Sequence, residues 1–182
     1  LIDIGQYGNT KGLPAADYKL SHRLSNGSGC FTFCMCPGGY VMPSMSEKNT
    51  IVTNGMSEYK RDSGFANSAV LVGITPDDYG KGVFDGIVLQ ESLEKKAFEF
   101  GKNYAAPAVR VEDFVCGRVS KNLANYKTTY SRGLINADFQ RIFDKNILDG
   151  MREGIVAFGR KINGFDKNGI LIGVESRSSS PV

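Results

Sequence analysis

The sequence predicts an α+β domain in which a mixed or antiparallel sheet, built from hairpins in the N-terminal third, packs against about three helices. Three observations lead to this fold class: two hairpin-like strand pairs early in the chain, helical periodicity after them, and a return to strand periodicity near the end. The 182 residues suffice for one sizeable core, and no sequence repeat is present. We therefore expect a single domain over residues 1–182.

The strands are predicted from apolar runs separated by turn residues. Residues 18–24 and 30–36 flank the segment 25–29, whose Asn26-Gly27 pair is typical of a hairpin turn. A second hairpin is expected where 50–53 and 56–59 flank Asn54-Gly55. The apolar run 69–74 predicts another, more buried strand.

The helices follow from apolar residues spaced three and four apart. Such spacing covers 83–100, with Gly101 as a plausible end, and recurs over 148–162 before the strand-like run 170–174. A further helix is expected after Asn136, which could cap it. The segment 102–132 has no clear period, so we expect mostly loop with a short helix around 111–115.

Composition excludes several classes of protein. A net charge of +3 is too small to indicate a nucleic-acid partner. No apolar stretch approaches the roughly 18–20 residues of a membrane-spanning helix, and no signal peptide opens the chain, so a cytoplasmic protein without membrane contact is expected. The four cysteines are expected to be reduced thiols, because a chain of this length needs no disulfides for stability.

The segment 33–40 carries the densest chemical signal. Cys34 and Cys36 would point to the same face of an extended strand, which makes a redox pair conceivable. Pro37, Gly38 and Gly39 would let the backbone approach a flat ligand such as a flavin ring. The alternative is a tight turn between two strands, with the cysteines as small core residues.

Other candidate sites are weaker. No metal site is predicted, because His22 is the only histidine and no second cysteine pair completes four ligands. His22 itself is expected to form a surface hydrogen bond. The segment 80–86 superficially resembles a dinucleotide loop, but its glycine spacing is one residue too long and Asp77-Asp78 would repel a pyrophosphate, so a helix-entry loop is predicted.

At Phe33-Cys34-Met35-Cys36-Pro37-Gly38-Gly39 the sequence resembles a bacterial family of uncharacterised FAD-dependent, NAD(FAD)-utilising dehydrogenases. The resemblance extends in order over nearly the whole chain. Further similar segments are Leu13-Pro14-Ala15-Ala16-Asp17-Tyr18-Lys19-Leu20, Val52-Thr53-Asn54-Gly55-Met56-Ser57, Arg61-Asp62, Ala66-Asn67-Ser68-Ala69, Ala157-Phe158-Gly159-Arg160-Lys161-Ile162 and Gly173-Val174-Glu175-Ser176-Arg177-Ser178-Ser179-Ser180-Pro181-Val182.

The resemblance implies that residues 1–182 are the middle, insert or substrate-side domain of a larger flavoprotein with two dinucleotide-binding-type parts. It implies FAD as cofactor, NAD(P)H as a candidate electron donor, a small-molecule substrate, and the flanking FAD-binding domain as partner. The Rossmann-type Gly-x-Gly-x-x-Gly segment of the family has no counterpart here, so this chain alone is expected to be inactive and not to bind FAD tightly.

The resemblance also suggests site residues. Cys34 and Cys36 are candidates for catalysis. The cofactor-binding candidates are Pro37, Gly38, Gly39, Arg177, Ser178 and Ser179, and the substrate-binding candidates are Asn54, Met56 and Arg61. Two other functions stay open at this point: a partner-binding or regulatory module without a catalytic role, and a thiol redox protein built on the two cysteines.

Overall fold

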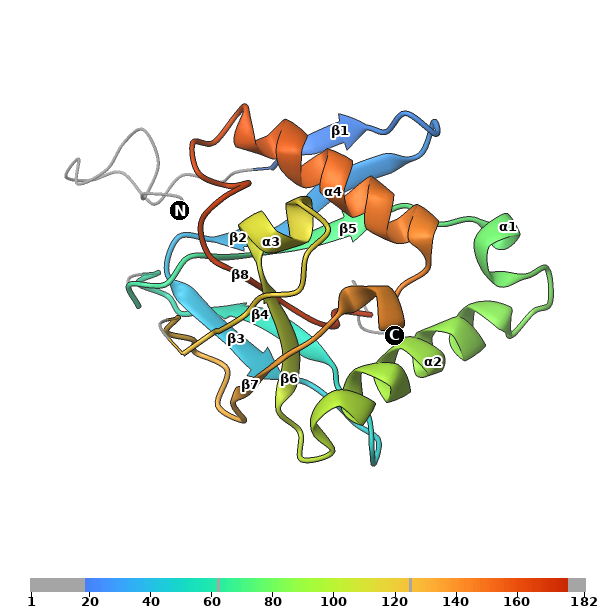
Figure 1. Ribbon diagram of the computed structural model, residues 1–182, viewed down its shortest axis with the longest axis horizontal. Coiled ribbons are helices and arrows are strands. Elements are labelled where there is room, and N and C mark those ends of the chain that lie inside the picture. The colour runs from blue at the N-terminus through green and yellow to red at the C-terminus, as the bar shows by residue number, and fades with distance from the viewer. Residues whose placement is uncertain (1–18, 62, 125, 177–182) are drawn as a thin grey trace.

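The computed structural model describes residues 19–61, 63–124 and 126–176, which form an α+β domain (Figure 1). Three small sheets lie in it, and their strand orders are β1-β2-β5, β3-β4 and β7-β6-β8. Two longer helices, α2 and α4, flank them. The predicted fold class is confirmed.

The first sheet contains the predicted first hairpin. Strand β1 (Ser21–Arg23) pairs antiparallel with β2 (Gly29–Cys36), and β2 pairs antiparallel with β5 (Asn67–Val72). Strand β5 matches the strand predicted for 69–74, but its residues are half-buried and not the more buried ones expected. Alternate residues of β2 are buried: Cys30 and Thr32 are covered, whereas Phe31 lies on the opposite, more open face. The predicted turn and both strands therefore hold.

The second predicted hairpin is wrong. Asn54 and Gly55 do not form a turn but lie inside strand β4 (Thr53–Ser57), which pairs antiparallel with β3 (Gly39–Pro43). Gly55 stands opposite Val41 in this ladder. The residues after Pro37 indicate only a turn, so the sequence does not predict strand β3, which is the strand that pairs with β4.

One strand of the third sheet, β6, lies within the segment 102–132, which the sequence predicts to be mostly loop. Strand β6 (Ala106–Arg110) pairs parallel with β7 (Leu134–Asn136) and antiparallel with β8 (Ile170–Ile172). The short helix α3 (Val111–Val115) follows β6 as predicted.

The expected helix after Asn136 is replaced by a single 3₁₀ turn, η1 (Phe139–Arg141). Asp138 caps this turn, since its side chain accepts a hydrogen bond from the backbone N of Gln140 at 3.0 Å. Asn136 belongs to strand β7 and caps no helix. The apolar residues that suggested a helical face, Phe139 and Ile142, instead enter the core.

The long helices agree with their predicted periodicity. Helix α2 (Asp85–Gly101) follows the short helix α1 (Pro76–Tyr79) and packs against β6. Helix α4 (Lys145–Gly159) lies across β1, β2 and β5 (Figure 1). None of the helices in the described ranges is long and apolar enough to cross a membrane.

Two apolar clusters form the core. The smaller one, between α4 and the first sheet, contains Leu20, Leu24, Cys30 and Phe158. The larger one joins the third sheet to α2, α3, α4 and η1, and its buried residues include Ile51, Val109, Phe114, Phe139, Ile142, Ile155 and Val174. The close packing in both clusters fixes α4 and the segment 173–176 relative to the sheets.

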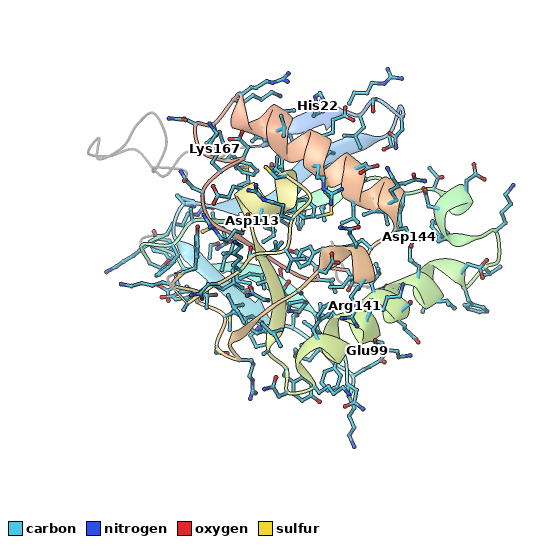
Figure 2. All side chains as sticks on the ribbon, viewed as in Figure 1. His22, Glu99, Asp113, Arg141, Asp144 and Lys167 are labelled. Carbon is cyan, nitrogen blue, oxygen red and sulfur yellow. The ribbon has the colours of Figure 1, made fainter. Side chains whose placement is uncertain are left out.

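His22 lies on β1 near the end of α4, at the surface (Figure 2). Its Nε2 is 3.3 Å from Oε1 of Glu153, which also accepts hydrogen bonds from the backbone N of Ser25 at 2.9 Å and, through Oε2, from its hydroxyl at 2.7 Å. The predicted surface hydrogen-bonding role of His22 is confirmed. This cluster ties the first hairpin to α4.

Candidate functional site

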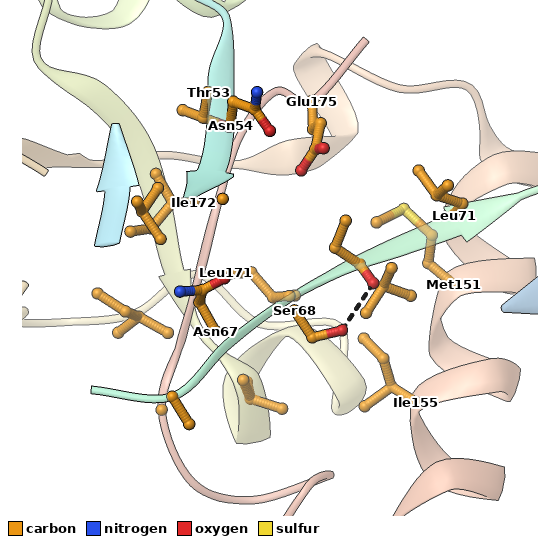
Figure 3. Close-up of a pocket in the computed structure, with 18 of the residues that line it drawn as sticks. Thr53, Asn54, Asn67, Ser68, Leu71, Met151, Ile155, Leu171, Ile172 and Glu175 are labelled. Atoms are coloured by element: carbon orange, nitrogen blue, oxygen red, sulfur yellow. Dashed lines mark hydrogen bonds between the residues drawn. The ribbon is translucent and has the colours of Figure 1, made fainter. Parts of the chain in front are cut away.

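A cavity of about 660 Å³ lies where β4, β5 and β8 meet α4 (Figure 3). Its volume falls within the range of small-molecule sites, roughly 300–1,000 Å³. Each wall comes from an element that is held elsewhere by core packing, so the cavity is formed before any ligand arrives.

Apolar side chains make most of the walls. Leu71 comes from β5, Met151 and Ile155 come from α4, and Leu171 and Ile172 come from β8 (Figure 3). The helical spacing of Met151 and Ile155 places both on the face of α4 that turns toward β5. A ligand in this cavity would therefore contact apolar surface from β5, β8 and α4.

A few polar side chains interrupt these walls. The Ser68 hydroxyl donates a hydrogen bond to the carbonyl of Ala69 at 2.9 Å, so its proton is already used. By contrast, Nδ2 of Asn67 is buried and has no hydrogen-bond acceptor in the part of the chain that the structure describes. Asn54 and Glu175 also line the cavity, and Figure 3 shows the Glu175 carboxyl directed into the space beside Asn54.

Glu175 is the acidic side chain of this site. Burial raises the pKa of its carboxyl to about 7. Within residues 19–61, 63–124 and 126–176 the carboxyl makes no hydrogen bond or ion pair, and burial is the cause of its shift. Apolar surroundings disfavour the charged form, so close to neutral pH the carboxyl readily gains or loses a proton.

Hydrogen bonds on both sides of Glu175 hold its backbone in place. The carbonyl of Val174 accepts a hydrogen bond from the backbone N of Thr53 at 2.8 Å. The Ser176 hydroxyl donates to Oε1 of Glu94, a fully buried residue of α2, at 2.6 Å. The segment that carries Glu175 is thus tied to β4 on one side and to α2 on the other.

The raised pKa of Glu175 leads to a prediction about stability. The carboxyl ionises near pH 4.5 when the chain is unfolded and near pH 7 when it is folded, so the folded state holds more protons between these values. Stability attributable to this group is therefore full below about pH 4.5 and is lost as the pH rises through 7. Urea unfolding from pH 4.5 to 8 should show this loss in the wild-type chain.

The control for this prediction is Glu175→Gln, which cannot ionise. The difference in free energy of unfolding between the variant and the wild type should grow in favour of the variant as the pH rises from 4.5 to 8. A difference independent of pH would show that the carboxyl is solvated like an ordinary surface glutamate.

The two cysteines predicted to be catalytic do not share a face. The pairing of β2 with β5 is irregular between Phe33 and Cys36, and Cys34 has a left-handed φ of 47°. As a result Cys34 is exposed and Cys36 is buried, and both are free thiols. The expectation of a common face is wrong because a bulge interrupts the regular alternation of the strand.

The exposed thiol of Cys34 is also poorly suited to nucleophilic chemistry. Partial desolvation, and then the negative charge of Glu175, raises the pKa of the Cys34 thiol above its ordinary value. A raised pKa reduces the fraction of reactive thiolate. The charge effect further indicates that Cys34 lies near Glu175, beside the cavity.

The Pro37-Gly38-Gly39 segment links β2 to β3, and only Gly39 of the three lines the cavity. A Cβ at Gly39 would lie 2.2 Å from the carbonyl oxygen of Met56 on the paired strand. The close pairing of β3 with β4 therefore already requires glycine at this position, whether or not a ligand binds beside it.

The remaining predicted site residues are dispersed. Asn54 lines the cavity, whereas Met56 is an exposed residue of β4 and Arg61 lies in the following turn, outside the cavity lining. Arg177, Ser178 and Ser179 lie outside the described residues. Of the predicted site residues that the structure describes, it thus brings Gly39 and Asn54 to the cavity.

Sequence reasoning missed Asn67 and Glu175 as site residues. Both stand in segments that carry the family resemblance, and a polar residue beside apolar strand positions was the available signal. Neither segment suggested a role by itself, because the two residues are more than 100 positions apart and meet only through the tertiary fold.

The segment 80–86 is a helix-entry loop, as predicted. The carboxylate of Asp85, the first residue of α2, accepts a hydrogen bond from the backbone N of Gly82 at 2.8 Å. The same carboxylate lies against Gly80, where an added Cβ would be 2.2 Å from it. An anionic side chain therefore occupies the place that a phosphate would need.

Comparisons with known proteins bear on the whole chain. Residues 1–178 match the model of a family described as FAD-dependent protein, C-terminal domain-like. An uncharacterized protein of Clostridium beijerinckii (strain ATCC 51743 / NCIMB 8052) is 38% identical over 189 residues. That alignment covers 100% of this chain and 36% of the relative, so the chain spans about a third of the relative's length.

Proposed function

The chain belongs to the FAD-dependent protein, C-terminal domain-like family, and we propose that it forms the substrate side of the flavin site in an oxidoreductase. The observation that carries the proposal is the preformed, mostly apolar cavity, which is lined by the Glu175 carboxyl and the Asn67 amide nitrogen, two groups that find no partner among the described residues. The flavin, when bound, supplies the electron or hydride transfer. This chain supplies position, exclusion of water and a proton-holding group.

The residues present fit one part of FAD. Asn67 Nδ2 is a buried donor at the cavity that finds no acceptor among the described residues, and a bound ring that offers a carbonyl oxygen would satisfy it. The apolar walls suit a flat heterocycle. The glycine-containing loop at the start of α2 does not suit the pyrophosphate, since the Asp85 carboxylate already accepts from the backbone N of Gly82 there. The described residues therefore fit the ring side of the cofactor.

Each group at the cavity then has a separate task. Met151 and Ile155 exclude water from the buried end, and the Asn54 amide can both donate to and accept from a ligand. Glu175 can hold or release a proton near neutral pH. NAD(FAD)-utilising dehydrogenase activity, with a nicotinamide as electron donor, is the reaction type that we assign to the whole protein.

The experiment that tests this function is FAD binding by two chains. The 182-residue chain is titrated with FAD and followed by flavin fluorescence, and we expect binding weaker than micromolar because the pyrophosphate and adenosine contacts are missing. A longer chain that adds the Rossmann-type segment should be purified with bound yellow flavin.

Two results would contradict the proposal. A longer chain that stays colourless and takes up no FAD on reconstitution would exclude a flavin site. Submicromolar binding by the 182-residue chain alone would show that the nucleotide part of the cofactor also binds here.

A second candidate function is that of a partner-binding module. Apolar side chains are exposed where α2 begins: Val83 is 92% exposed and Phe84 70%, and Ile87 and Val88 are exposed beside them. Such a patch is typical of a protein contact surface. Absence of flavin from the longer chain would favour this function over the first.

A further inference from the structure

Glu175 is an unusual occupant of an apolar cavity. Nothing in the described ranges pairs with its carboxyl. The side chains across the same space, Leu71 and Met151, are apolar (Figure 3). An unpaired carboxyl taken out of water lowers stability unless a partner compensates for the lost hydration. The hydrogen bonds of Val174 and Ser176 nevertheless hold the segment so that the carboxyl faces the cavity. A ligand could provide the missing partner.

We propose that the cavity binds a small apolar amine, whose protonated nitrogen pairs with the Glu175 carboxylate while its hydrocarbon part lies against Leu71, Met151 and Ile155. The proposal rests on the proposed function in one respect: the bound amine would be the substrate of the flavin. It deepens that function by naming the substrate class.

The charged groups around Glu175 allow this pairing. Lys127 and Tyr126 line the cavity as well, but neither forms an ion pair or hydrogen bond with Glu175. Glu94 lies behind Ser176 on α2, and Cys34 lies on the β2 side. A cation that enters the cavity therefore meets a carboxyl that no cationic side chain of residues 19–61, 63–124 and 126–176 has neutralised.

The same arrangement disfavours the other simple ligand classes. A carboxylic acid would place a second negative charge beside Glu175 and lose affinity. A neutral alcohol of the same shape could donate one hydrogen bond to the carboxylate, but it brings no positive charge to compensate the buried negative one. The amine is the ligand that gains most from this geometry.

The test uses the 182-residue chain without FAD and two probes of nearly equal shape, benzylamine and benzyl alcohol. Calorimetry should show that the wild-type chain prefers the amine by about 10-fold to 100-fold at pH 8. The preference should shrink at pH 6, where the carboxyl is mostly protonated. Glu175→Gln should abolish it, and Glu175→Asp should keep part of it.

The matched control is Glu99→Gln on the outer face of α2, which removes an exposed carboxylate away from the cavity and should leave the preference unchanged (Figure 2). Equal affinities for the two probes in the wild-type chain would overturn the proposal, and so would an amine preference that persists in Glu175→Gln. Because no flavin is present, these outcomes are independent of the FAD experiment, whose failure would remove the flavin site and leave the amine site standing.

Discussion

Replacing Gly154 by valine is expected to lower the free energy of unfolding by about 3 kcal/mol, the upper end of the usual cost of overpacking. Gly154 lies on the face of α4 that contacts the first sheet, where an added Cβ would be 2.2 Å from Sγ and 2.7 Å from Cβ of Cys30. Cys30 is fully buried, so its thiol cannot move aside into solvent. The helix would have to lift from the strand.

Urea unfolding of the variant and the wild type measures this effect. The matched control is Gly86→Val, a helical glycine of α2 whose added Cβ would meet nothing closer than 3.7 Å and which should cost far less. Cys30→Ala removes the nearest atom, so the cost of Gly154→Val should fall in that background. If the two valine substitutions cost the same, the close approach of α4 to β2 would not be what requires glycine at this position.

Gly154 also shows which part of the fold the sequence could predict. The periodic apolar residues of 148–162 predicted helix α4, and Asn26-Gly27 predicted the first hairpin, because these signals are local. The need for glycine at 154 depends on Cys30, which is more than 100 residues away in the chain. A contact of that kind leaves no local pattern.

The wrong predictions of secondary structure have the same cause, which is pairing between segments that are far apart in the sequence. Strand β6 is short and buried on all sides, so it shows neither helical nor alternating periodicity and was expected to be loop. Asn54-Gly55 carried a turn signal, yet pairing with β3 holds it extended. In both cases tertiary pairing overrides the local preference of the residues.

The residues of the candidate site divide in the same way, into those with a local sequence signal and those that only the tertiary fold reveals. Gly39 and Asn54 could be named from the sequence because they stand in recognisable segments. Glu175 could not, since its importance arises from burial and from the absence of a pairing group among the described residues, which are properties of the folded chain. Cys34 and Cys36 were misjudged because a bulge separates them.

The residue that holds Glu175 in place is Glu94, and Glu94→Ala is expected to lower the free energy of unfolding by about 2–4 kcal/mol. Glu94 is fully buried in α2 and accepts hydrogen bonds from the Ser176 hydroxyl at 2.6 Å and from Nε2 of Gln90 at 3.3 Å. Alanine would leave a cavity, and it would leave the Ser176 hydroxyl without this acceptor. The segment 173–176 would lose its attachment to the helix.

Glu94→Gln separates the two effects, since glutamine fills the same space and keeps an oxygen that can accept from Ser176; it should cost clearly less than alanine. Unfolding of Glu94→Ala, Ser176→Ala and the double variant completes the cycle. The double variant should cost less than the sum of the two single costs, because the loss of Ser176 matters less once its acceptor is gone. Strictly additive costs would mean that Glu94 stabilises α2 alone and does not position the segment that carries Glu175.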